Sequence, residues 1–171
     1  MIAIPTVYSG VQMRSRMEAR FAKWCDDHKM KWQYEPEGYV CNGQAYLPDF
    51  YLPEIMCFVE VKPIAFIHEA KKMEAMANAS EMWNHDFLVV DMSDGFTPIK
   101  WFERGDDPMG KSVHFGEDVL VNWCRKCLSM VLVGYGGWDC RRCGEYDGNS
   151  HLIAWIDPHT GEEKHSARTA K

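Results

Sequence analysis

Two neighbouring stretches, Tyr46-Leu-Pro-Asp-Phe-Tyr-Leu-Pro53 and Phe58-Val-Glu-Val-Lys-Pro63, carry the pattern from which the fold and chemistry of this chain can be predicted. Each contains a short run of apolar and aromatic residues, and the proline and glutamate between the runs predict the turn of a β-hairpin. Side chains two positions apart in a strand share one face, so Glu60 and Lys62 point the same way. Antiparallel pairing through the turn would then bring Asp49 alongside Glu60.

Two carboxylates and an amine in one patch suggest a metal-assisted reaction. Carboxylates held together repel each other, and a hard divalent cation such as Mg²⁺ or Mn²⁺ relieves this repulsion. Such a cation can polarise a phosphate and lower the pKa of a bound water, while Lys62 holds the attacking water or offsets charge on the phosphate. In the alternative interpretation, Asp49 caps a turn and the E-x-K triplet is the solvated face of a strand. The compound pattern favours hydrolysis of a phosphodiester by metal-activated water.

The flanking sequence predicts an α/β fold with a mixed sheet. Apolar residues recur at helical spacing near the N-terminus, and a later segment without Gly or Pro is rich in Ala, Met, Glu and Lys. Runs of apolar and aromatic residues predict strands. The predicted order is a helix at 11–29, strands at 31–37, 44–52 and 56–62, a helix at 67–83 and a strand at 86–91.

Pro48-Asp49 and Glu60-Val61-Lys62, within this order of elements, resemble the PD-(D/E)XK nucleases, a family that includes restriction enzymes and Holliday junction resolvases. The resemblance covers residues 14–91 and implies a restriction-endonuclease-like core. It also implies that Asp49 and Glu60 bind the catalytic Mg²⁺ or Mn²⁺, helped by the carbonyl of Val61. Lys62 would serve the nucleophile.

Many members of that family carry a glutamate on the first helix, and Glu18 stands where it would be expected. The resemblance implies that Glu18 completes the metal site, and its place at the edge of the apolar stripe would let it point toward the sheet. The alternative is an exposed glutamate that pairs with Arg14, four residues earlier, for about a few tenths of a kcal/mol. Arg16 and Arg20, on either side of Glu18, cannot both share its face, and they bind phosphate or serve solubility.

Two C-x-x-C pairs, Cys124-Arg-Lys-Cys127 and Cys140-Arg-Arg-Cys143, lie close to the spacing of a zinc ribbon. Four thiolates supply a tetrahedral site, and the segment between the pairs can form a short hairpin that brings them together. Zinc would largely replace a hydrophobic core in so small a unit. The sequence therefore predicts a structural Zn²⁺ held by Cys124, Cys127, Cys140 and Cys143.

Composition divides the chain into a nuclease domain at 1–103, a polar linker at 104–116, a zinc-ribbon module at 117–157 and a flexible tail at 158–171. No apolar run approaches the roughly 18–20 residues that a membrane span needs. Seven cysteines without an export signal favour reduced thiols or metal ligands. We therefore expect a cytoplasmic protein with no membrane partner, and the resemblance to the nuclease family implies a bacterial host or a phage-infected cell.

The net charge of −6, from 19 basic and 25 acidic residues, argues against a whole-surface nucleic-acid binder, so any DNA contact must be local. Basic residues near the first predicted helix and beside the cysteines are the candidates. Their alternative roles are an ordinary solvated face and neutralisation of the zinc–thiolate charge. The candidate DNA-binding residues are Arg14, Arg16, Arg20, Arg125, Lys126, Arg141 and Arg142.

The sequence thus predicts a Mg²⁺- or Mn²⁺-dependent DNA endonuclease whose zinc ribbon assists substrate binding. Three alternatives stay open. They are a structure-specific, junction-resolvase-like nuclease, which would act as a homodimer; a catalytically inactive DNA-binding or recruitment protein that acts through its zinc ribbon; and a nuclease directed at RNA. The clustered carboxylates argue against the inactive protein, because a binding scaffold has no need of groups that repel phosphate.

Overall fold

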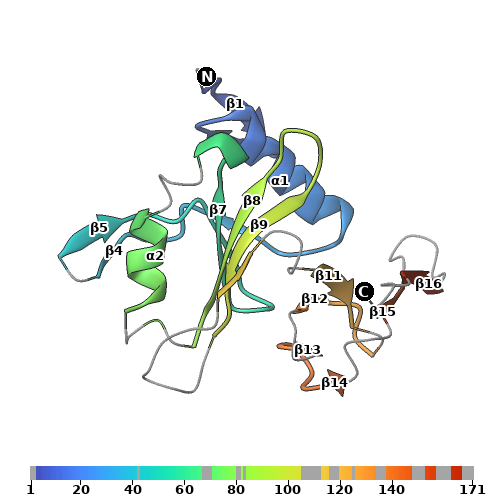
Figure 1. Ribbon diagram of the computed structural model, residues 1–171. Helices are drawn as coiled ribbons and strands as arrows, with labels where there is room; N and C mark the ends of the chain where they lie inside the picture. Colours follow the sequence, from blue (N-terminus) through green and yellow to red (C-terminus); the bar gives the residue numbers. More distant parts are fainter. Residues whose placement is uncertain are drawn as a thin grey trace.

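The computed structural model describes residues 3–41, 43–66, 71–79, 82, 84–104, 113–115, 120–124, 126–133, 138–147, 153–156 and 163–166. The described part of the chain contains two α-helices and a six-stranded mixed sheet (Figure 1), which confirms the predicted α/β class. Its first elements are β1 (Thr6–Tyr8), β2 (Val11–Met13), α1 (Arg16–Asp27), β3 (Gln33–Tyr34), β4 (Tyr39–Cys41), β5 (Gln44–Tyr46), β6 (Phe50–Leu52), β7 (Cys57–Val61), α2 (Lys71–Ala77), β8 (Asp86–Asp91) and β9 (Thr97–Phe102). The strands that follow are β10 (Val113–Phe115), β11 (Leu120–Trp123), β12 (Met130–Val133), β13 (Trp138–Asp139), β14 (Tyr146–Asp147), β15 (Ile153–Ile156) and β16 (Glu163–Ser166).

The central sheet has the strand order β10-β9-β8-β7-β6-β3. Neighbouring strands are antiparallel except β7 and β8, which run parallel. A parallel pair cannot be joined by a tight turn, so the chain crosses over between them through the segment that contains α2. The predicted hairpin is confirmed, because β6 and β7 pair antiparallel with Phe50 opposite Val59.

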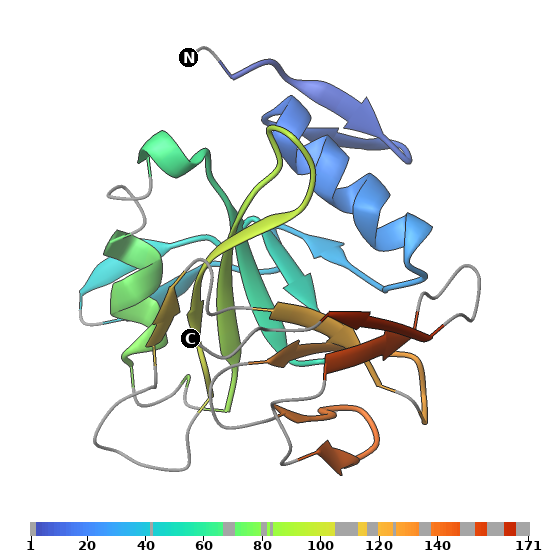
Figure 2. The same cartoon turned by 45° about the vertical axis from the view of Figure 1, so that its right-hand side comes forward.

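Alternate residues of the central strands face different layers. Phe50 and Val59 belong to a core that includes residues of α1, whereas Tyr51 and Phe58 belong to a second core that includes residues of α2. Figure 2 shows the two helices on either side of the sheet. Every residue of β7 and β8 is buried, as expected for parallel strands that are covered on both faces.

Helix α1 begins later than the apolar periodicity predicts. The prediction of a helix from residue 11 is wrong, because Val11–Met13 pairs with Thr6–Tyr8 in a β-hairpin. Ser15 then has an extended backbone, and its Oγ accepts a hydrogen bond from the Glu18 amide, as in a helix N-cap. Just beyond the other end, Lys29 adopts a positive φ of 58°, which helical backbone does not allow.

The remaining predicted elements are mostly shorter in the structure. The first predicted strand contracts to β3, and the 44–52 run divides into β5 and β6 around Pro48, which has no amide hydrogen to donate. The helix predicted at 67–83 is observed as α2, and residues 67–70, 80, 81 and 83 lie outside the described residues. The strand predicted at 86–91 is confirmed over its full length as β8.

Two strands beyond residue 104 lie in segments that the sequence predicts as a linker and a tail. β10 lies in the predicted linker and extends the sheet beside β9, and β16 lies in the predicted tail and pairs with β15. Both regions are locally polar, but a strand at an edge needs only backbone partners. Trp123 and Met130, on the β11–β12 hairpin, join the core that contains Phe21 of α1, and Trp123 stacks on His28 at a centroid distance of 5.1 Å. This hairpin therefore shares a core with the predicted nuclease domain.

Within the described residues, neither helix is long and apolar enough to cross a lipid bilayer.

Replacement of Phe50 by Ala tests the core beneath α1. Phe50 is fully buried, and its ring contacts those of Phe21 and Tyr34 at centroid distances of 4.8 and 5.3 Å. We expect Phe50→Ala to lower the free energy of unfolding, measured by urea denaturation, by about 3–5 kcal/mol. The control Val40→Ala, at an exposed side chain, should change it by less than about 0.5 kcal/mol. Equal effects of the two substitutions would contradict this assignment of the core.

Candidate active site and cysteine cluster

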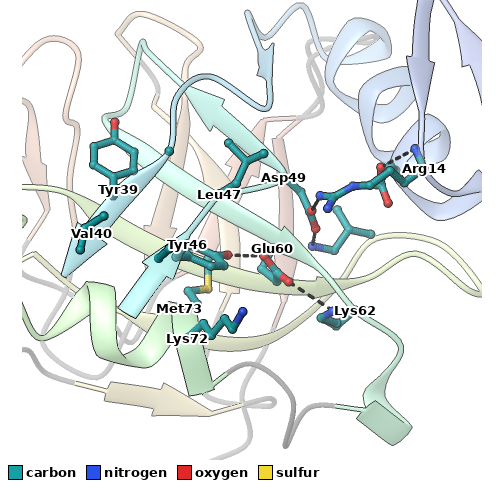
Figure 3. A pocket seen from close by; sticks show the side chains of 14 residues that line it. Arg14, Tyr39, Val40, Tyr46, Leu47, Asp49, Glu60, Lys62, Lys72 and Met73 are labelled. Atoms are coloured by element: carbon teal, nitrogen blue, oxygen red, sulfur yellow. Dashed lines mark hydrogen bonds and ion pairs between the residues drawn. The ribbon is translucent and has the colours of Figure 1, made fainter. Parts of the chain in front are cut away.

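Asp49 and Glu60 face each other at one end of the sheet. The register pairs Phe50 with Val59, so its continuation by one residue places Asp49 opposite Glu60. Opposite residues of an antiparallel pair point to the same face, with Cβ atoms about 4.5–5.5 Å apart. Both residues are buried, with exposed fractions of 5% and 7%, and they line a cavity of about 850 Å³ (Figure 3). The structure therefore brings together the two carboxylates that the sequence singles out.

The two carboxylate oxygens of Asp49 have hydrogen-bond donors from two different parts of the chain. Oδ2 accepts a hydrogen bond from the Val61 amide of β7 at 2.8 Å, and Oδ1 lies 2.5 Å from Nη2 of Arg14. Nε of the same guanidinium lies 2.9 Å from Glu35. The sequence indicates Arg14 only as a DNA contact or a partner of Glu18, but the structure places its guanidinium between two other carboxylates. No local pattern signals this arrangement, because it joins residues far apart in the chain.

Glu60 is held by a tyrosine and a lysine. The hydroxyl of Tyr46, on β5, donates a hydrogen bond to Oε2, and Nζ of Lys62 lies 3.4 Å from Oε1 (Figure 3). Burial raises the pKa of Tyr46 and the charge of Glu60 raises it further, so Tyr46 keeps its proton and remains a donor. Lys62 lies where the E-V-K pattern predicts. Lys72 of α2 lines the same cavity, and the motif gives no sign of it.

The surroundings of Asp49 disfavour its ionised form. Burial raises the pKa of Asp49 and the charge of Glu60 raises it further, to about 8, while the Val61 amide and the Arg14 guanidinium act in the opposite direction. The negative charges of this cavity are therefore only partly compensated. A strongly perturbed carboxyl group in a cavity is typical of a functional site.

Glu18 lines the same cavity but has hydrogen-bond donors of its own. Its carboxylate accepts bonds from the Arg14 amide at 3.0 Å, the Ser15 hydroxyl at 2.8 Å and the Tyr34 hydroxyl at 2.7 Å. It is only 6% exposed, so the alternative of an exposed glutamate is wrong. The arrangement is a variant of the capping box, in which an acidic side chain of the first turn reaches back to the start of the helix. Arg14 therefore connects the two carboxylates, because its backbone amide donates to Glu18 and its guanidinium binds Asp49.

Arg16 and Arg20 lie on the first part of α1, away from the two buried carboxylates. Arg20 donates to the carbonyls of Met92 and Ser93 at 3.1 and 2.7 Å. Both arginines line a second cavity, next to the first, to which Glu18 also contributes. Lining one cavity does not place these side chains on one face of the helix, so the expectation that Arg16 and Arg20 cannot both share the face of Glu18 stays a prediction.

Four cysteines form a separate cluster in the C-terminal part of the chain. The Sγ atoms of Cys124, Cys127, Cys140 and Cys143 all lie within 4.8 Å of one another. Cys124 lies 3.6 Å from Cys143, and Cys127 lies 3.4 Å from Cys140. These separations exceed the roughly 2.05 Å of a disulfide and approach the roughly 3.8 Å expected between tetrahedral ligands about 2.3 Å from a metal. The cluster could therefore hold one metal ion.

The two cysteine pairs have equivalent backbone geometry. The amides of Leu128 and Gly144, each directly after the second cysteine, donate to the carbonyls of Cys124 and Cys140, both at 2.8 Å. Leu128 and Gly144 also both adopt positive φ, 58° and 73°. Each pair lies at the turn of its own hairpin, β11–β12 or β13–β14. The hairpin predicted between the pairs falls partly on residues 134–137, which lie outside the described residues, and β12 pairs with β11.

Basic residues beside the cysteines have acidic neighbours. Arg141, whose side chain is 13% exposed, lies 3.4 Å from the buried carboxylate of Asp86 at the start of β8. Lys126 and Arg142 have carboxylates at 3.3 and 3.9 Å. The guanidinium of Arg141 is therefore engaged in an ion pair with the sheet, a role that neither the predicted DNA contact nor its alternatives include. Arg125 lies outside the described residues.

Comparisons with protein-family models, curated proteins and solved structures found no significant match. The geometry itself defines a mixed α/β protein with a buried carboxylate site in its sheet and a four-cysteine cluster that could hold a metal.

The raised pKa of Asp49 predicts a pH-dependent stability. The folded protein holds this proton more tightly than the unfolded chain, whose aspartate has a pKa near 3.8. The stabilising contribution is therefore complete below about pH 4 and is lost as the pH rises through about 8. We expect the free energy of unfolding, measured by urea titration without divalent cations, to fall over this interval.

The variant Asp49→Asn lacks the titrating group and should not show this part of the fall. The control Asp94→Asn, in an exposed loop, should follow the parent chain. Parallel profiles for Asp49→Asn and the parent chain would contradict the assigned pKa.

Proposed function

We propose that this protein is a metal-dependent DNA endonuclease of the restriction-endonuclease type, which hydrolyses phosphodiester bonds. One observation carries the proposal: the buried carboxylates of Asp49 and Glu60 face each other, with Lys62 beside Glu60. Packing alone gives no reason to bury two like charges together, because their repulsion and desolvation oppose folding. A site that binds a cation and a phosphate does give a reason.

The order and pairing of the elements support a restriction-endonuclease-like core. Helix α1 precedes the β6–β7 hairpin, and β8 lies parallel to β7 after a crossover that contains α2. The two motif carboxylates lie at the same end of this hairpin. This arrangement agrees with the resemblance to the PD-(D/E)XK nucleases noted in the sequence.

The carboxylates fit a hard divalent cation such as Mg²⁺ or Mn²⁺. Each oxygen of Asp49 and Glu60 has one donor or cationic partner in the structure, so lone pairs remain for a metal. Two carboxylates, with the Val61 carbonyl as a further oxygen, suit an ion that keeps several water ligands. When bound, the ion would polarise the phosphate and lower the pKa of a coordinated water. Glu18, with three donors of its own, would position Arg14 and join the ligands only by exchanging a donor.

The side chains of the cavity would orient the reactants and balance their charge. Lys62 is placed to hold the attacking water or to offset charge that develops on the phosphate. Arg14 and Lys72 bring further positive charge to the same cavity. Tyr46 donates to Glu60 and fixes its orientation, so the carboxylate loses little freedom when the substrate binds.

We further propose that the cysteine cluster holds a structural Zn²⁺. Four thiolates favour a soft or borderline cation over Mg²⁺, and four protein ligands leave no open position for catalysis. The repeated geometry of the two cysteine pairs is that of a preformed site. Arg141 links this cluster to Asp86 in the sheet, so the ion would support the catalytic core as well as its own hairpins.

Cleavage assays test the proposed activity. Labelled linear duplex, single-stranded, flapped and four-way-junction DNAs, together with RNA, would be incubated with Mg²⁺, Mn²⁺ or chelator. We expect metal-dependent DNA cleavage and a loss of about 10²-fold or more in Asp49→Asn and in Lys62→Ala, because each removes charge from the reacting site. Asp94→Asn should remain fully active. Cleavage of RNA alone, or an active Asp49→Asn, would contradict the proposal.

Metal analysis tests the zinc site. We expect about one zinc per purified chain and its loss in the double variant Cys140→Ser, Cys143→Ser. The loss should also lower the Tm, because the metal takes the place of a core in this region. Cys25→Ala, which alters a buried cysteine of the main core, should retain the zinc. Iron in place of zinc, or zinc retained by the double variant, would refute the assignment.

A further inference from the structure

A second cavity, of about 570 Å³, lies beside the candidate active site. It shares Glu18, Val61 and Lys62 with the first cavity, so the two meet at the end of β7. Its walls include the first turn of α1 and Phe66, in the turn that follows β7. Figure 1 shows that the start of α1 and the end of β7 lie at the same end of the molecule. Together the two cavities form a groove that passes Lys62, and we call it the Lys62 groove.

Positive charge gathers along the Lys62 groove although the chain as a whole is acidic. Among the described residues that line the groove, five cations, Arg14, Arg16, Arg20, Lys62 and Lys72, outnumber three carboxylates, those of Glu18, Asp49 and Glu60. Glu18 is already engaged by three donors, which spread its charge. The bonds from Arg20 to two backbone carbonyls hold its guanidinium in place. A positive groove on an acidic protein fits a polyanion rather than a neutral ligand.

Apolar surface flanks Lys62 on both sides of the groove. Val40 and Leu47 line the first cavity and are 76% and 37% exposed. Ile4 and Phe66 line the second. Duplex DNA turns its phosphates outward and keeps its bases stacked inside, whereas a single strand also offers base faces that pack on apolar and aromatic side chains. Cations interleaved with apolar surface therefore suit an unpaired strand.

We infer that the Lys62 groove binds one unpaired strand of DNA, with the scissile phosphate beside Lys62 and flanking nucleotides in the two cavities. This inference rests on the proposed endonuclease function and narrows its substrate to single-stranded DNA or to an unpaired segment such as a flap. In the second cavity, Arg16 would contact a phosphate of the strand and Phe66 would pack against a base.

Fluorescence anisotropy with labelled oligodeoxythymidylates of increasing length, in chelator, tests the groove directly. We expect affinity to rise with length until the strand fills both cavities, and a blunt duplex of equal length to bind at least about 10-fold more weakly. Arg16→Ala should weaken binding of the longest oligonucleotide and reduce the slope of log affinity against log salt by about 0.7, because one phosphate contact is lost. Phe66→Ala should weaken binding by about 5-fold or more without changing that slope.

Lys23→Ala is the matched control. Lys23 lies on the same helix, is exposed, pairs with Asp27 and lies outside both cavities, so its removal should leave affinity and salt slope unchanged. Duplex binding as tight as single-strand binding, or an Arg16→Ala slope equal to that of the parent chain, would overturn the inference.

Cleavage by the same preparations in Mg²⁺ separates the inference from the proposed function. A chain that cuts duplex DNA and binds single strands no better than duplex keeps the endonuclease function and loses the inference. A chain that binds single strands through Arg16 and Phe66 but cuts no DNA keeps the groove and loses the endonuclease function.

Discussion

The antiparallel register of β6 and β7 places two buried carboxylates opposite each other, and much of the surrounding structure compensates for this repulsion. Asp49 accepts a hydrogen bond from the Val61 amide and pairs with the Arg14 guanidinium. Glu60 accepts a hydrogen bond from the Tyr46 hydroxyl and pairs with Lys62. These donors come from three separate parts of the chain, because Val61 and Lys62 are neighbours in sequence. The compensation is incomplete, since the pKa of Asp49 is still raised. Under the proposed function, a divalent cation would supply the remaining compensation.

The sheet explains why the carboxylates cannot move apart. β7 is buried along its whole length, with α1 covering one face and α2 the other, so a shift of one residue would turn its apolar side chains toward the wrong core. The parallel partner β8 adds a second constraint on the same register. The hydrophobic layers thus hold Asp49 and Glu60 together, and the polar groups around them adapt to that position.

Short sequence patterns were enough to predict the elements whose partners lie close by in the sequence. The β6–β7 hairpin and β8 follow from alternation and turn residues, and the pairing of Asp49 with Glu60 follows from the hairpin. The start of α1 was predicted wrongly, because Val11–Met13 has helical spacing but finds a strand partner in Thr6–Tyr8. Tertiary pairing overrode periodicity there.

The same limit applies to the candidate site. The E-V-K motif leads to Lys62, but no short-range signal leads to the guanidinium of Arg14 beside Asp49 or to Tyr34 beneath Glu18. Both contacts join segments that meet only after the sheet and α1 have packed. Tyr46 lies close to Asp49 in sequence, yet its role depends on β5 turning back toward Glu60. Residues that neutralise a buried charge are found from the fold, whereas residues that carry the charge can be found from the motif.

An ion pair between Arg141 and the buried carboxylate of Asp86 connects the cysteine cluster to the same sheet. Asp86 is the first residue of β8 and lies opposite Cys57, the first residue of β7. Its carboxylate accepts hydrogen bonds from the Trp101 indole and the Arg104 amide, and it lies beside the Arg141 guanidinium. Burial raises the pKa of Asp86, and Arg141 opposes that rise. Arg141 directly follows Cys140, so the fold of the cysteine pair determines where its guanidinium lies. Disruption of the cluster would leave Asp86 buried without its main counter-charge, which would destabilise the fold. Asp86 lies at one end of the β7–β8 pair, and the two carboxylates lie at the other. The integrity of the cysteine cluster and the rigidity of the strand that carries Glu60 are therefore physically coupled.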